Sequence, residues 1–104
     1  MEDMEMICCQ IIAQAGTAKS SFIEGMRAAR EGDFTRAEKL LTEGNAAFAK
    51  AHDAHRQLLV KEANGEKIEF SLLLLHAEDQ LNSADIFKTV AEENVEMLRV
   101  LLHK

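Results

Sequence analysis

Helix-forming sequence is interrupted at only two places in this chain, and both interruptions are built around a glycine. The sequence contains no proline, so no residue inside it forces a helix to break. At Glu31-Gly32-Asp33 the glycine suits the left-handed residue that closes a helix, and the aspartate suits the cap of the next one. Asn64-Gly65-Glu66-Lys67 is a second helix stop followed by a polar restart. The pattern predicts three helices.

Apolar residues recur every three or four positions between these breaks, which predicts helices over about residues 4–31, 34–63 and 70–103. Leu72–Leu75 alone would also fit a buried strand, but the period continues beyond it and favours helix. Because the connections are short, consecutive helices must be antiparallel. We expect an all-α antiparallel three-helix bundle with long helices, forming a single domain over residues 1–104. Gly44 inside the second helix costs about 1 kcal/mol relative to alanine and marks a bend or a close helix contact.

Charge and hydropathy exclude several classes of protein. The net charge is −6, from 12 basic and 18 acidic residues, and this balance disfavours direct binding to nucleic acid or to anionic lipid. The longest apolar run, Leu72–Leu75, is far shorter than the roughly 20 residues of a membrane span. The first five residues are acidic where a signal peptide would be basic. We therefore expect a cytoplasmic protein with no membrane insertion.

The third predicted helix has two faces, and each of them needs a neighbouring helix to pack against. One seam is apolar apart from a single lysine and suits the internal core: Phe70, Leu74, Ala77, Leu81, Ala84, Lys88, Ala91, Val95, Leu98 and Leu102. The second seam has polar residues in its middle: Leu72, His76, Asp79, Ser83, Ile86, Val90, Glu93 and Met97. Residues two apart lie about 200° apart around a helix, so His76 points away from Leu74. Another subunit is the simplest cover for this second seam.

His76 and Asp79 are the strongest candidates for chemistry. They stand at positions i and i+3, so their side chains can lie close. A carboxylate beside an imidazole can fix its orientation and tautomer, which suits a phosphoryl acceptor and equally suits an inert buried pair. If several subunits met at this seam, their Asp79 carboxylates would approach one another and would need shared protons or a bound cation.

Two other groups of residues have side chains that can bind a metal, but they are weaker candidates for a functional site. His52 and His55 are also three apart, but no third ligand has convincing spacing, so a solvated polar stretch is favoured over a metal site. Cys8 and Cys9 are adjacent, which makes a disulfide between them geometrically unusual. Reduced thiols with one facing inward are favoured over a soft-metal site. A P-loop, a nucleophile elbow, HExxH and paired CxxC are absent from the sequence, which argues against an autonomous hydrolase or an NTP-dependent kinase.

The segment from Ser71 to Leu81, SLLLLHAEDQL, resembles the active-site helix of one family. This family is the lactose/cellobiose-type (lactose/N,N'-diacetylchitobiose) enzyme IIA of the bacterial phosphoenolpyruvate-dependent sugar phosphotransferase system. A run of the form S-L-x-L-x-H-A-Q-D-H-L recurs in it. Further matches follow in order along nearly the whole chain: Gly16-Thr17-Ala18-Lys19-Ser20, Gly32-Asp33-Phe34, Ala51-His52, Leu58-Leu59 and Glu62-Ala63-Asn64-Gly65.

The resemblance implies a three-helix subunit, a homotrimer and a phosphocarrier role in disaccharide uptake. His76 would accept a phosphoryl group from the histidine-containing phosphocarrier protein and pass it to a cysteine of enzyme IIB. Asp79 would lie at the trimer axis, where it can hold Mg²⁺, with no other cofactor implied. Gln80 stands where the family usually has a second histidine and keeps a supporting hydrogen-bonding role, while Asp85 should add negative charge near the axis. The alternative is a non-enzymatic helical adaptor or regulatory oligomer in which His76 and Asp79 are only structural.

Overall fold

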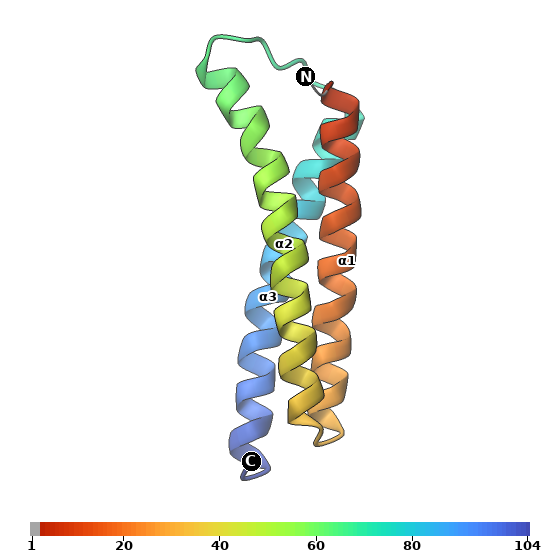
Figure 1. Cartoon of the computed structure of the whole chain (residues 1–104), viewed down its shortest axis with the longest axis vertical. Coiled ribbons are helices and arrows are strands. Elements are labelled where there is room, and N and C mark those ends of the chain that lie inside the picture. Colours follow the sequence, from red (N-terminus) through yellow and green to blue (C-terminus); the bar gives the residue numbers. More distant parts are fainter. Residues whose placement is uncertain (1–2) are drawn as a thin grey trace.

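Three long helices lie side by side in an elongated bundle (Figure 1). The structure is a computed structural model and describes residues 3–104, so residues 1 and 2 of the predicted domain lie outside it. The helices are α1 (Met4–Arg30), α2 (Phe34–Ala63) and α3 (Leu72–Leu101). The bundle measures 53 × 21 × 17 Å, and the chain runs down α1, up α2 and down α3. The predicted all-α antiparallel arrangement is confirmed.

The two connections have the chemistry that the sequence predicts. Gly32 has a φ of 85° and Gly65 a φ of 86°, conformations that glycine adopts at little cost. The Asp33 carboxylate accepts a hydrogen bond from the backbone N–H of Arg36 at 3.0 Å and caps the start of α2. The α1–α2 turn is tight. Residues 64–71 instead pass over the upper end of the bundle, where α2 splays away from α1 (Figure 1).

The core follows the inner faces of the helices and is rich in alanine, which lets the helices approach closely. The buried apolar residues of α1 are Ile7, Cys8, Ile11, Ala15, Ala18, Phe22, Ala28 and Ala29. Phe22 and Gly44 approach closely, since a Cβ added to Gly44 would stand 2.6 Å from Cε1 of the Phe22 ring. Of the two interpretations of Gly44, the close helix contact is therefore confirmed.

The third helix is shorter than predicted at both ends. It spans Leu72–Leu101, whereas the apolar seam predicted 70–103. Ser71 is extended (φ −151°) and its hydroxyl accepts the Leu74 N–H, so this cap starts the helix at Leu72 and leaves Phe70 outside it. Phe70 is 74% exposed and Leu102 44% exposed, and neither belongs to the core that was predicted for them. Lys88, the polar member of that seam, is half-buried and pairs with Glu92 at 2.9 Å.

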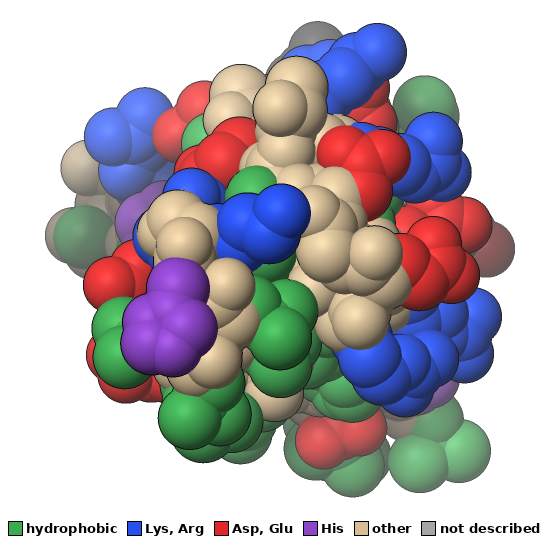
Figure 2. Space-filling view, turned by 90° about the horizontal axis from the view of Figure 1, so that it is seen from below, with side chains coloured by type: hydrophobic (Ala, Val, Ile, Leu, Met, Phe, Trp, Pro, Cys, Tyr) green, Lys and Arg blue, Asp and Glu red, His purple; other side chains and the backbone are tan. Residues whose placement is uncertain are grey.

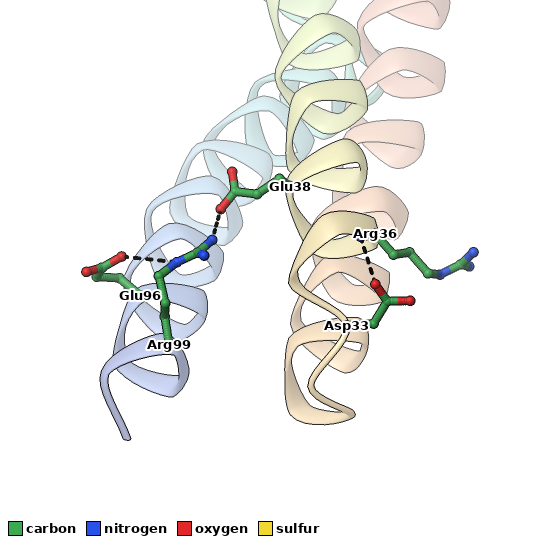
Figure 3. Close-up of polar contacts among 5 residues, drawn as sticks. All are labelled: Asp33, Arg36, Glu38, Glu96 and Arg99. Carbon is green, nitrogen blue, oxygen red and sulfur yellow. Dashed lines mark hydrogen bonds and ion pairs between the residues drawn. The ribbon is translucent and has the colours of Figure 1, made fainter. Parts of the chain in front are cut away.

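The lower end of the bundle is held by an arginine that joins α3 to α2. The Arg99 guanidinium pairs with Glu38 and lies 3.7 Å from Glu96 (Figure 3). It also stands over the Phe34 ring, 4.9 Å from the ring centroid, in a cation–π contact. Acidic and basic side chains are interspersed over this end (Figure 2). This end is therefore built for structural closure rather than for collecting one sign of charge.

The two cysteines differ in exposure, which confirms that one faces inward. Cys8 is buried and Cys9 exposed. Burial raises the pKa of the Cys8 thiol, and the charges of Cys9 and Glu78 raise it further. Within residues 3–104, no helix is long and apolar enough to cross a membrane.

We expect native protein at pH 8 to alkylate at Cys9 well before Cys8, because the thiolate is the reactive species and a raised pKa keeps Cys8 protonated. Cys8 must also wait for a local opening of α1. Counting adducts by mass spectrometry with iodoacetamide checks this: one fast adduct per chain in buffer and two in guanidinium. In Cys9→Ser the fast adduct should vanish; equal rates at both thiols would contradict the buried position of Cys8.

Candidate functional site

His76 lies exposed near the start of α3. The Ser71 cap, whose hydroxyl accepts the Leu74 N–H at 3.0 Å, starts the helix at Leu72 and makes His76 its fifth residue. The His76 ring makes no hydrogen bond or ion pair with any residue in the range 3–104. Its imidazole is therefore free to meet a partner from solution. The cap also fixes the direction in which the first turns of α3 present it.

Asp79 and Gln80 lie on opposite sides of His76 around the helix. At about 100° per residue, Asp79 is displaced by about 60° one way and Gln80 by about 40° the other. Asp79 is exposed and forms no ion pair with His76 inside the described chain, so the close pairing that their spacing allows is not made. Gln80 is half-buried and faces α1. His76 thus stands on the boundary between the α1 contact and the free side of α3.

Lys19 of α1 is a site residue that sequence spacing did not identify. Its ammonium donates to Oε1 of Gln80 at 2.5 Å and to Oγ of Ser83 at 3.5 Å. In the sequence it lies within Gly16-Thr17-Ala18-Lys19-Ser20, one of the segments that resemble the family. A signal did exist: Lys19 follows buried Ala18 and is half-buried itself, as expected of a lysine whose stem packs against a neighbouring helix while its charge reaches the edge.

The side of α3 beyond Asp79 carries an exposed apolar surface, here called the free stripe. Its members are at least half exposed: Leu72, Leu75, Ile86, Val90, Met97, Val100 and Leu101. Around the helix they fall within about 60° of the Asp79 direction. Exposed apolar side chains aligned along one side of a helix are typical of interaction sites. The second seam predicted from the sequence is thus real, with a carboxylate in its midst.

The opposite side of α3 faces α2. The contacts there show that the solvated polar stretch predicted for His52 and His55 is wrong in part. His55 is not simply solvated, because its side chain is only 16% exposed and its Nε2 lies 2.7 Å from Oε1 of Glu78. His52 is exposed and tilts against the Phe48 ring. Asp85 lines the same groove between α2 and α3. It lies about 120° around the helix from Asp79, and its added negative charge near the axis stays a prediction.

The residues that could bind a metal are dispersed over the described part of the chain. Across residues 3–104, no three histidine, cysteine or acidic side chains gather as a metal site would require. Asp79 presents one carboxylate among the apolar residues of the free stripe. A hard cation takes about six oxygen ligands. Asp79 can supply one of these ligands, and copies of the chain or water would supply the others.

The fold and these side chains can be compared with known proteins. A family model described as "PTS system, Lactose/Cellobiose specific IIA subunit" matches residues 6–99. The chain belongs to this family. The resemblance seen in the sequence is therefore confirmed, and this IIA protein is a phosphotransferase-system component of sugar transport.

Curated relatives cover nearly the whole length of this IIA protein. A lactose-specific EIIA component of Staphylococcus aureus (strain N315) is 37% identical over 98 residues, which are 94% of this chain and 95% of the relative. A lichenan-specific phosphotransferase enzyme IIA component of Bacillus subtilis (strain 168) is 41% identical over 96 residues, 92% and 87% of the two chains. The relatives named for different sugars are similarly close, so overall similarity does not choose the sugar.

Solved structures of relatives share the three-helix architecture. The cellobiose-specific enzyme IIA of Bacillus anthracis superposes with a TM-score of 0.93 at 32% identity, covering 100% of this chain and 96% of that one. A IIA(Chitobiose) in complex with HPr, from the N,N'-diacetylchitobiose system, gives a TM-score of 0.83 at 25% identity, covering 97% and 98%. That relative, whose structure is of a complex with HPr, shares the fold of this chain.

Proposed function

We propose that this IIA protein is a phosphocarrier of disaccharide uptake, working in the cytoplasm. It accepts a phosphoryl group on His76 from the histidine-containing phosphocarrier protein and passes it to a cysteine of enzyme IIB. The observation that carries the proposal is the exposed imidazole of His76 near the start of α3, which forms no hydrogen bond or ion pair with any described residue. The structure of a relative bound to HPr supports the donor. The sequence contains no P-loop, in agreement with a phosphoryl group supplied by another protein.

For the transfer, this chain needs only to present the His76 ring to its partners and to stabilise the charge of the phosphoryl group. A ring nitrogen of His76 donates its lone pair to phosphorus while the P–N bond to the donor imidazole breaks. The donor imidazole then takes up a proton from solvent, and the phosphorylated His76 ring releases its N–H proton to solvent. In the second transfer a cysteine thiolate of IIB attacks phosphorus, the P–N bond to His76 breaks, and the His76 ring takes up a proton again. Both partners must reach the same exposed ring, so short-lived docking is expected.

The free stripe supports a homotrimer. It runs along α3 as an apolar surface that a single chain leaves uncovered, and burying apolar side chains against a second copy contributes favourably. Symmetric assembly through α3 would bring the Asp79 carboxylates together, which requires neutralisation. Mg²⁺ held by Asp79 from each subunit would supply it, as a structural counter-charge rather than a participant in transfer. His76, at the margin of the stripe, would stay reachable beside the subunit junction.

The test of the function is reconstitution. The chain is incubated with phosphoenolpyruvate, enzyme I and the histidine-containing phosphocarrier protein, and we expect one acid-labile phosphoryl group per chain, released when a IIB protein is added. Omitting the carrier protein should abolish labelling. If the complete mixture leaves the chain unlabelled while a relative's IIA is labelled in parallel, the adaptor alternative replaces this proposal.

Asp79→Leu should keep the trimer or tighten it, because an apolar side chain replaces a carboxylate within an apolar stripe. Sedimentation velocity over a dilution series measures the association. A chelator should weaken the parent trimer and leave the Asp79→Leu trimer unchanged if the carboxylates hold a divalent cation. Asp53→Leu, which removes an exposed charge on α2, should behave as the parent. Dissociation of Asp79→Leu to monomers with an unchanged helical signal would contradict this placement.

A further inference from the structure

The orientation of the Gln80 side-chain amide is set by Lys19. A lysine ammonium has three donors and no acceptor, so it can bond only to the amide oxygen. Lys19 Nζ lies 2.5 Å from Gln80 Oε1, which turns that oxygen towards α1. The amide nitrogen, with two N–H donors, is then directed away from Lys19. Within residues 3–104, neither of these N–H groups has a hydrogen-bond acceptor.

Those free donors lie one helical turn from His76. Residues four apart on a helix face the same side, with about 5–6 Å between their Cβ atoms. A group carried on the His76 ring is therefore within reach of the Gln80 side chain. Lys19 itself is restrained, since its ammonium also donates to Ser83 Oγ at 3.5 Å and its stem is half-buried. The donor pair is thus held before any phosphoryl group arrives.

We propose that Lys19 is a positioning residue for phosphoryl transfer, which locks the Gln80 amide so that its N–H groups donate to the phosphoryl oxygens on His76. The proposal rests on the proposed function and adds to it. No proton or bond is exchanged by Lys19 or Gln80. Phosphoryl oxygens are charged acceptors, and hydrogen bonds to them are among the stronger ones. A donor oriented in advance needs no rearrangement as the phosphoryl group arrives.

Rapid-quench kinetics of phosphoryl transfer from the phosphorylated carrier protein test this role. We expect Lys19→Met and Gln80→Met each to slow acceptance about tenfold, the loss of one hydrogen bond to a charged group. Because Lys19 acts through Gln80, the double variant should also be about tenfold slow rather than a hundredfold. Lys19→Arg, which still donates to Oε1, should recover most of the rate. Lys39→Met removes the same charge from an exposed position early in α2, at the far end of the bundle, and should match the parent (Figure 1).

A spectroscopic measurement separates this role from the function itself. In the unphosphorylated chain, Lys19→Met should shift the ¹⁵N-labelled side-chain amide resonances of Gln80, and Lys39→Met should not. Resonances that do not respond to Lys19→Met would overturn the positioning role, as would a Lys19→Met rate equal to that of Lys39→Met, or a hundredfold loss in the double variant. A parent chain that takes no phosphoryl group would instead remove the function, whatever the resonances do.

Discussion

His76→Gln should take no phosphoryl group from the phosphorylated carrier protein, so the acid-labile label falls to background. The amide of glutamine is polar and of similar reach, but its nitrogen lone pair is delocalised into the carbonyl and cannot attack phosphorus. The ring makes no hydrogen bond or ion pair within residues 3–104, so its removal should change the free energy of unfolding by less than about 0.5 kcal/mol. Labelling, circular dichroism and melting measured on one preparation check both statements.

The matched controls for this prediction are the other histidines. His52→Gln and His103→Gln change exposed side chains and should be labelled as the parent is. His55→Gln interrupts the contact with Glu78 and should also keep the label, since that pair lies on the α2 side of α3. A labelled His76→Gln, or a parent-like label lost only in His55→Gln, would place the acceptor elsewhere.

The fold was largely predictable because the residues that end and start its helices are identified by local sequence. Gly32 and Gly65 occupy left-handed backbone conformations that the sequence marks directly, and no proline competes with the helical period. The ends of α3 were less accessible to such reasoning. Phe70 fits the apolar period of the helix, but Ser71 caps the N-terminus, so the helix starts only at Leu72. Periodicity therefore located the helices, and side-chain capping set where the last one begins.

The site was predictable only in part, for a physical reason. His76, Asp79 and Gln80 lie within five consecutive residues of one helix, so helical geometry alone relates them. Lys19 and Gln80 are 61 positions apart, and their contact depends on the register in which α1 packs against α3. The period of a single helix does not determine that register. The same limit hid the contact between His55 and Glu78, which are 23 positions apart.

The packing of α1 against α2 also depends on close helix contacts, and Gly44 provides one of them. Gly44→Val should lower the free energy of unfolding by about 3 kcal/mol, at the upper end of overpacking costs. The new Cβ would stand 2.6 Å from Cε1 and 2.7 Å from Cδ1 of Phe22, and this ring is fully buried, with no exposed surface into which it can move. Thermal melting at a fixed chain concentration measures the loss, as a fall of about 15 °C for a domain of this size.

Gly16→Val is the control, because a Cβ at Gly16 meets nothing within 4 Å and valine gains a few tenths of a kcal/mol over glycine inside a helix. Adding Phe22→Leu to Gly44→Val should recover part of the lost stability, since the smaller side chain gives back the volume that valine takes. The pair would then be less destabilising than the sum of its parts. Gly44→Val melting with the parent would show that α1 and α2 do not touch at this point.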